Sequence, residues 1–435
     1  MPVIHNREIE PMIKPAYSLA EIQGIANFLT AKGTLVFTPL PNGLFPAAAL
    51  GADRSYTGYS DVWVRDNVHV AHAHYRTGHT AIAVQNLQTL MTYFMMHQQR
   101  FLAIINGTAD ANVPMNRPHI RFQGDSLAEA PKPWAHAQND ALGYFLWMFC
   151  KLANDHALIP DPSQLEMLAR FAAYFEAIRY WQDEDSGHWE ETRKISASSI
   201  GTVVAGLLEF KTLLSSTGPV FVCQGQAVTM DTLDSLIVFG QTALLKILPA
   251  ECIQPDPEKL RPYDSALLFL LYPLQLVAGP IAEQILTNVK THLQGEFGIR
   301  RYLNDSYWAP DYREKVPAAQ RTADFSDNLA GRNQLLAAEG QEAQWCIFDP
   351  IVSCIHGMRF KSSHAPVDLA AQAEYLNRSL GQITATGLID LPAFRCPELY
   401  SLESEEYVPN DHVPLLWTQA NLMLALKLME ETCAQ

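Results

Sequence analysis

Apolar residues recur mainly at helical spacing along the whole chain, and the strict alternation of a half-buried strand is scarce. Segments rich in Pro, Gly, Asn and Asp separate these periodic stretches and predict loops between helices. The pattern predicts helices over residues 18–31, 66–77, 79–101, 137–155, 163–182, 197–215, 227–248, 264–275, 280–294, 340–358, 366–386 and 414–432.

Long loops recur about once for each pair of predicted helices, at residues 33–62, 104–135, 183–196, 299–330 and 388–412. Neither a low-complexity linker nor a shift in composition divides the chain. No repeat consensus is present, which disfavours an open solenoid. We therefore predict an all-α fold in which six helical hairpins close into a barrel. Residues 1–435 would form a single domain, with residues 1–17 as an extended amino-terminal segment.

The composition excludes several classes of protein. Hydrophobic residues make up 48% and charged residues 18% of the chain, which excludes extensive disorder. The net charge of −15 argues against a nucleic-acid partner, because phosphate binding needs clustered Lys and Arg. No secretory signal and no stretch of ~18 uninterrupted apolar residues is found, so we expect no membrane contact. Seven widely spread cysteines fit free thiols, which predicts a cytoplasmic protein.

Candidate chemistry lies in four loop segments that mix aromatic with charged residues. Aromatic faces pack on the apolar faces of sugar rings, while Arg and Asp form bidentate hydrogen bonds to neighbouring hydroxyls. Taken singly, each segment has a structural explanation, because Asp66 and Asp140 would suit the first turn of a helix and Ser196 a helix cap. Together they predict a carbohydrate site. The segments are Tyr59–Asp66, Trp134–Asp140, His188–Glu191 and Arg300–Trp308.

A cluster of histidines offers a competing interpretation. His69, His72, His74 and His79 lie in one predicted helix and the turn after it. His69 and His72 share a helical face, which is compatible with a metal site. The sequence places no further ligand nearby except Asp66, which the carbohydrate site requires. We therefore interpret these histidines as packed or exposed side chains and expect neither a metal nor a cofactor.

The segments resemble glycoside hydrolase family 15, the glucoamylases, and still more the glucoamylase-like amino-terminal domain of phosphorylase kinase α and β subunits. Five family motifs occur in unchanged order over residues ~55 to ~430, which is more specific than any single motif. The closer likeness to the kinase subunits rests on Trp63–Val68, Ala197–Gly201 and Pro397–Tyr400. The five motifs are Trp63-Val64-Arg65-Asp66 with Tyr59 before it; Trp134, Gln138 and Asp140; Trp189-Glu190-Glu191; Arg301, Tyr302, Asp305 and Tyr307; and Pro397-Glu398 ahead of Leu416-Trp417.

The resemblance implies an (α/α)6 barrel of the six-hairpin glycosidase type, with its site at the wide end. It implies an inverting, exo-acting hydrolase that releases glucose from α-linked gluco-oligosaccharides or glucans. Glu190 would be the general acid and Glu398 the general base. The implied substrate contacts are Tyr59, Trp63, Arg65, Asp66, Trp134, Gln138, Asp140, Trp189, Glu191, Arg301, Tyr302, Asp305 and Trp345.

The chemistry of inversion makes different demands on the two carboxyl groups. Glu190 must stay protonated near neutral pH, a state that an apolar wall at Trp189 and the nearby carboxylate of Glu191 would favour. Glu398 must be ionised to activate water, and the pair should stand ~6.5–9.5 Å apart. Because Glu403 and Glu405 follow closely, Glu398 also fits a solvated acidic loop. We predict that Glu190 and Glu398 face each other across one pocket.

Two other functions remain open at this point. A glycan-binding or regulatory protein would keep the pocket without useful turnover, as is suspected for the kinase subunits. The long carboxy-terminal region of those subunits, where calmodulin binding is expected, has no counterpart here, so we expect a free-standing protein without calmodulin. A helical interaction scaffold, in contrast, predicts that the aromatic and charged loops scatter over the surface.

Overall fold

A computed structural model describes residues 2–48, 59–217, 220–223, 226–322, 329–386 and 391–435. Within these residues, six helices contact one another in a closed ring, each packing against the next and the last against the first. The ring explains why residues far apart in the sequence lie side by side. Its members, in order, are α2 (Val64–Arg76), α5 (Asn139–Asn154), α7 (Ala197–Thr217), α9 (Leu268–Leu271), α13 (Phe348–Ser363) and α15 (Leu416–Cys433).

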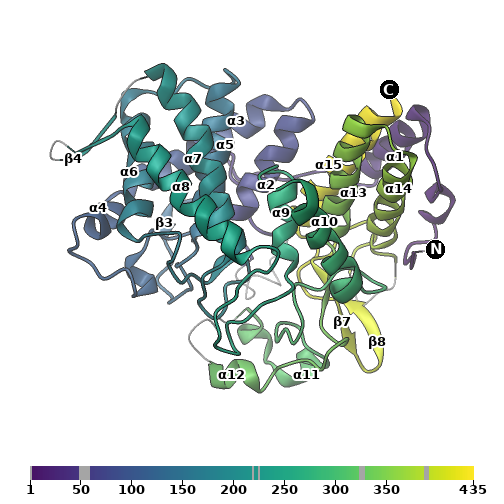
Figure 1. Cartoon of the computed structure of the whole chain (residues 1–435). Coiled ribbons are helices and arrows are strands. Elements are labelled where there is room, and N and C mark those ends of the chain that lie inside the picture. The colour runs from purple at the N-terminus through teal and green to yellow at the C-terminus, as the bar shows by residue number, and fades with distance from the viewer. Residues whose placement is uncertain (1, 49–58, 218–219, 224–225, 323–328, 387–390) are drawn as a thin grey trace.

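A second layer of helices alternates with the ring along the chain (Figure 1). Ring helices are buried all round, as α2 is from Val64 to His74, whereas outer helices bury one face only, as α1 does through Ile22, Ile25 and Leu29. This contrast is the expected consequence of two helical layers. The predicted (α/α)6 barrel is therefore confirmed. The outer helices are α1 (Leu19–Ala31), α3 (Thr80–Met96), α6 (Pro162–Ala177), α8 (Met230–Ile247), α10 (Gly279–Asn288) and α14 (Pro366–Gly381).

Local sequence sets where several outer helices begin. Ser18 and Glu21 form a reciprocal capping box at the start of α1. Asp161 and Gln164 do the same for α6, with Pro162 in the first turn. Such caps satisfy backbone N–H groups that have no partner within the helix. The starts of these two outer helices can thus be predicted from the local sequence.

Several predicted helices differ in extent from the structure, and three of them are informative. The segment 79–101 is broken after Met96, and α4 (Gln99–Ile105) follows. The segment 264–275 shortens to η5 (Ser265–Leu267) and α9, because Pro273 has no N–H and disfavours helical geometry at Tyr272 before it. The segment 340–358 becomes helical only at Phe348, because Gln344 and Trp345 pair in a strand.

Short strands join the loops at one end of the barrel. Trp63 pairs with Arg121, and Trp345 pairs with Leu399. The pairing of these strands connects loops that carry candidate site residues. The short helices α11 (Tyr312–Lys315) and α12 (Leu329–Asn333) lie among the same loops (Figure 1). The strands are β1 (Val62–Trp63), β2 (Arg121–Gln123), β3 (Ala128–Glu129), β6 (Gln344–Trp345), β7 (Leu399–Glu403) and β8 (Glu406–Pro409), while β4 (Val220–Cys223) and β5 (Gln226–Val228) form a separate hairpin.

Helices α5 and α7 make the most intimate contact in the ring. A Cβ atom added at Gly143 would lie 2.7 Å from the backbone carbon of Thr202. One at Gly206 would lie 2.8 Å from the backbone oxygen of Gly143. Within α7, Ala197–Ser216 is apolar and long enough to cross a membrane by length and composition, and 78% of that window is buried inside the protein. The burial accounts for its apolar character as that of a core helix.

Replacing Gly143 by Ala should push α5 and α7 apart and lower the free energy of unfolding by about 1–3 kcal/mol. The matched control is Gly24→Ala in α1, where an added Cβ has no atom within 4 Å and should stabilise by about 0.5–1 kcal/mol. Urea denaturation followed by circular dichroism measures both. Equal effects of the two substitutions would contradict this account of the helix contact.

Candidate active site

The candidate residues gather where the ring helices begin. Trp63, Arg65 and Asp66 stand at the start of α2, and Glu190 lies in the loop that precedes α7. Glu398 lies in the loop between α14 and α15. Because consecutive ring helices are separated by one outer helix that returns the chain, they all begin at the same end of the barrel. Segments spread over more than three hundred residues therefore meet there.

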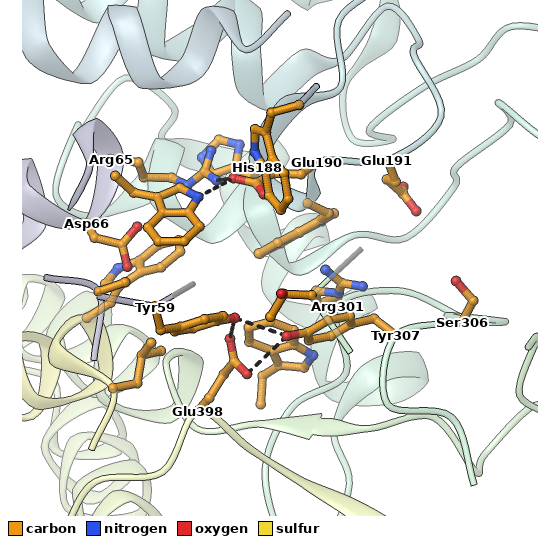
Figure 2. A pocket seen from close by; sticks show the side chains of 18 of the residues that line it. Tyr59, Arg65, Asp66, His188, Glu190, Glu191, Arg301, Ser306, Tyr307 and Glu398 are labelled. Atoms are coloured by element: carbon orange, nitrogen blue, oxygen red, sulfur yellow. Dashed lines mark hydrogen bonds and ion pairs between the residues drawn. The ribbon is translucent and has the colours of Figure 1, made fainter. Parts of the chain in front are cut away.

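One pocket at this end encloses about 870 Å³ of empty space, including the part open to solvent. Twelve of the fifteen predicted site residues line it, which contradicts the scattering expected of an interaction scaffold. Figure 2 shows Glu190 and Glu398 on opposite sides of the pocket. The twelve are Tyr59, Trp63, Arg65, Asp66, Trp134, Trp189, Glu190, Glu191, Arg301, Tyr302, Trp345 and Glu398.

The carboxylate of Glu398 is buried and surrounded by hydrogen-bond donors. Tyr59 donates its hydroxyl proton to Oε1 at 2.7 Å. Asn410 donates to Oε2, and Nδ1 of His412 lies 2.8 Å from the same oxygen. Tyr307 donates at 3.5 Å (Figure 2). Every one of these groups can donate to an ionised carboxylate, so the surroundings suit the charged form. Glu398 is thus not part of a solvated acidic loop.

The rings around Glu398 keep these donors in place. The ring of Tyr59 stacks on His412 with centroids 3.7 Å apart, and its hydroxyl lies 3.0 Å from that of Tyr307. Burial and the charge of Glu398 raise the pKa of Tyr59 well above its usual value. Burial and Glu398 have the same effect on the pKa of Tyr307. Both phenols therefore keep their protons and remain donors.

The carboxyl group of Glu190 has different partners. Its Oε1 accepts a hydrogen bond from Nε1 of Trp63 at 2.9 Å and one from Nη2 of Arg65 at 3.3 Å. Arg65 also donates to Asp140 at 2.5 Å and to Gln138 at 3.1 Å. Burial opposes the charge of Arg65, but Asp140 and Glu190 raise its pKa above the usual value. The positive charge is therefore shared between Glu190 and Asp140.

Glu190 is one of several non-glycine residues with a left-handed backbone conformation. It follows the short helix η4 (Gly187–Trp189) with φ 57° and ψ 43°, in the left-handed region. Few residues other than glycine adopt this conformation, and it costs free energy of order 1 kcal/mol or more. Nε1 of Trp189 donates to Asp264 at 2.9 Å and so fixes the preceding residue. Such local strain recurs at functional sites.

Asp66 is a third carboxyl group in the pocket. Its pKa is raised to about 7, mainly by burial; Arg65 opposes this rise, and Glu190 and Glu398 add to it. Both candidate catalytic glutamates therefore disfavour the ionised form of Asp66. The three carboxyl groups interact electrostatically within one pocket. Figure 2 shows Asp66 at one end of the pocket.

Glu191 has surroundings that the sequence did not predict. It lies 3.0 Å from Nζ of Lys194 and 2.9 Å from Nη2 of Arg261, and Tyr302 donates to it. Burial alone would raise the pKa of Glu191, but Arg261, Lys194 and other cations lower it well below the usual value. Its charge is balanced by these neighbours. The carboxyl group that interacts with Glu190 in the pocket is Asp66.

Three predicted substrate contacts lie behind the pocket wall. Gln138 and Asp140 bind Arg65, and Asp305 binds Arg301 through two hydrogen bonds of 2.7 and 2.6 Å. None of the three lines the pocket. In this structure their side chains fix the arginines that do line it.

Other pocket residues were absent from the predicted set. Tyr307 and Trp417 stood in the recognised motifs but were not assigned as contacts, and the aromatic pattern was the signal that pointed to them. Asn410 and His412, which contact Glu398, gave no signal, because they follow a run of acidic residues. The remaining lining residues that sequence reasoning missed are Ala47, His188, Ser306, Thr322, Arg332 and Leu415.

The histidines of α2 are packed inside the barrel. His69 stacks on Trp417 with centroids 4.7 Å apart, and His72 packs against Trp147. Burial lowers the pKa of His72 to about 3 and that of His74 to about 4, so both are neutral. In the part of the chain that the structure describes, no group of three or more His, Cys, Asp or Glu residues is arranged to bind a metal ion.

Comparisons with known proteins agree on the kind of fold. The sequence model described as "Glycosyl hydrolases family 15" matches residues 25–263, more than half of the chain. A wild-type glycosidase superposes with a TM-score of 0.64 at 16% identity, covering 94% of this chain and 97% of its own. The glucoamylase of Saccharomycopsis fibuligera gives 0.57 at 12% identity, covering 99% and 97%. At these identities the likeness concerns the fold alone.

Two curated relatives are similar in sequence. The uncharacterized lipoprotein YgeQ of Escherichia coli is 29% identical over 204 residues, 42% of this chain and 77% of the relative. A probable phosphorylase b kinase regulatory subunit alpha of Caenorhabditis elegans is 23% identical over 433 aligned residues, which include 88% of this chain. The alignment spans only 32% of that subunit.

The raised pKa of Asp66 predicts how stability depends on pH. Because the folded state binds the extra proton between pH 3.8 and about 7, the contribution of this group to the unfolding free energy falls as pH rises through that window. Relative to Asp66→Asn, the wild type should lose about 2–4 kcal/mol between about pH 4 and pH 7.5. Urea denaturation of both proteins at several pH values measures this. If the difference in unfolding free energy between the two proteins does not change with pH, the raised pKa assigned to Asp66 is wrong.

Proposed function

Because the chain belongs to glycosyl hydrolases family 15, we propose that it is an inverting, exo-acting glycoside hydrolase that releases glucose from α-linked gluco-oligosaccharides or glucans. The observation that carries the proposal is the pair of carboxyl groups, Glu190 and Glu398, on opposite sides of one pocket. Inversion needs such a pair, one to protonate the leaving oxygen and one to activate water from the other face.

Glu398 is the proposed general base. Its contacts with Tyr59, Asn410 and His412 stabilise the ionised form, which is the state that removes a proton from water. The Tyr59 hydroxyl donates to Oε1, and two of the other partners share Oε2. These contacts orient the carboxylate toward the space between the two glutamates, where the attacking water would lie.

Glu190 is the proposed general acid. Trp63 and Arg65 both donate to Oε1, so the transferable proton would be on Oε2. Asp140 balances the charge of Arg65 from behind, while the carboxyl groups of Asp66 and Glu190 repel each other on the pocket side when both are ionised. A proton on Glu190 relieves this repulsion. Once it has passed to the leaving oxygen, Arg65 stabilises the carboxylate that remains.

The shape and lining of the pocket support removal of a terminal sugar. Asp66 and Arg65 stand at one end and can bind vicinal hydroxyls of one glucose ring. Trp63, Trp134 and Trp417 line the pocket as apolar surfaces for sugar faces. Trp63 and Trp134 meet edge to face with centroids 6.2 Å apart. Arg121 contacts both rings, 4.5 Å from the centroid of Trp63 and 4.1 Å from that of Trp134, and so helps to fix their orientation.

The second candidate is a glycan-binding or regulatory protein without useful turnover. The similarity to a kinase regulatory subunit favours it. The ion pair between Arg65 and Glu190 favours it as well, because a cation stabilises the ionised form of a carboxyl group. The two candidates share the sugar pocket and differ only in whether Glu190 delivers a proton.

Turnover separates the two candidates. Purified protein is incubated with maltose, isomaltose, trehalose and longer α-glucans, and released glucose is measured. Glu190→Gln and Glu398→Gln should each lower kcat by about 10²–10⁴-fold, the range for loss of a general acid or base. Oligosaccharide binding should persist in both variants, because each amide keeps the size of the carboxyl group.

The matched control is Glu406→Gln, an exposed glutamate in the hairpin that follows Glu398. It should leave kcat unchanged. Binding of oligosaccharides by the wild type without release of glucose would establish the regulatory candidate instead. Undiminished turnover in Glu398→Gln would remove that residue from the mechanism.

A further inference from the structure

The pocket has a second end with a different chemical character. Figure 2 shows Asp66 at one end, Glu191 and Ser306 at the other, and Glu190 and Glu398 between them. If the sugar bound beside Asp66 is the one released, the end beside Glu191 receives the leaving group. The role of this end as a leaving-group site therefore rests on the proposed function.

Basic side chains predominate at the leaving-group end. Four cations, Lys194, Arg261, Arg301 and Arg332, all lower the pKa of the buried Glu191. Two further carboxylates contact this cluster. Asp264 lies 3.5 Å from Arg261, and Asp305 binds Arg301. Among the residues that the structure describes, four cations thus face three carboxylates, in a chain whose net charge is −15.

When these cations and carboxylates are paired, one positive charge has no carboxylate at hydrogen-bonding distance in the part of the chain that the structure describes. Asp305 takes up Arg301 through two hydrogen bonds. Oε1 of Glu191 contacts both Lys194 and Arg261, and its Oε2 accepts from Tyr302. Each of these cations therefore has a carboxylate at hydrogen-bonding distance.

Arg332 is the exception. Its closest carboxylate contact among the described residues is 4.0 Å, from Nε to Oε2 of Glu191, which is too long for a hydrogen bond. That Nε is buried and has no hydrogen-bond partner in the described structure. The Arg332 side chain is 7% exposed and lines the pocket. Burial and Asp264 raise the pKa of Glu251, a further buried carboxyl group, well above its usual value and so disfavour its ionised form.

We propose that the leaving-group end binds an anion, and that the substrate is an α-glucoside whose leaving sugar carries a phosphate ester. A guanidinium binds phosphate oxygens through paired, charge-assisted hydrogen bonds. This fits Arg332, whose side chain hydrogen-bonds to the hydroxyl group of Tyr302 but whose Nε has no hydrogen-bond partner among the described residues. The hydroxyl group of Ser306 lies at the same end and can donate to the anion. With a neutral sugar, the buried charge of Arg332 would have only the carboxylate of Glu191 nearby, 4.0 Å away and shared with Lys194 and Arg261, as its counter-charge among the described residues. The phosphate ester stays intact while the glycosidic bond is cleaved.

Binding to a catalytically inactive protein tests this inference separately from turnover. Titration calorimetry on Glu190→Gln compares glucose 6-phosphate with glucose. Glucose 6-phosphate should bind about tenfold tighter than glucose, as expected for one added charge-assisted contact. In the double variant Glu190→Gln/Arg332→Gln this preference should fall to within about twofold, while glucose affinity stays the same.

Two control variants complete the design. Arg359→Gln removes a positive charge from the surface of α13, where it pairs with Glu283, and should keep the full preference. Arg332→Lys keeps a positive charge at the site and should keep part of the preference for glucose 6-phosphate. This variant also tests the inference if Arg332→Gln does not fold. Equal affinities for glucose and glucose 6-phosphate in Glu190→Gln would overturn the inference, as would a preference that survives in Arg332→Gln. Absence of turnover in the wild type would refute hydrolysis and leave this test unaffected.

Discussion

The buried guanidinium of Arg65 is the constraint on which the site depends. A charge removed from water needs partners, and breaking a buried pair costs several kcal/mol. Those partners come from different parts of the ring: Asp140 and Gln138 from the start of α5, and Glu190 from the loop before α7. Satisfying one cation therefore fixes three chain segments at the same end of the barrel. The position of the proposed acid is a consequence of this pairing.

The two glutamates of the pocket show how environment assigns different roles to the same residue type. Glu398 is surrounded by donors that stabilise its charge, whereas Glu190 shares one cation with Asp140 and faces Asp66. The same principle operates on Glu191, which neighbouring cations keep ionised. In the proposed mechanism, charge distribution, rather than residue identity, separates the acid, the base and the supporting carboxylate.

Helical periodicity located all twelve barrel helices, because each buries a continuous stripe or its whole surface. Ordered motifs located most of the pocket, because aromatic and charged residues stand together at helix starts. Asn410, His412 and Arg332 were missed because their role arises from contacts with residues far away in the sequence. Likewise, nothing local distinguishes Asp140 or Asp305, which bind arginines, from residues that would touch a sugar. Glu191 was expected to act on Glu190, but Lys194 and Arg261 compensate its charge.

The most direct test of the account is the configuration of the first product formed. Glu190 and Glu398 on opposite sides of one pocket predict that water attacks from the face opposite the leaving group. Proton NMR of maltose hydrolysis, recorded before mutarotation, should then show the β-anomer of glucose appearing first. Initial release of the α-anomer would contradict an inverting pair and, with it, the roles given to both residues.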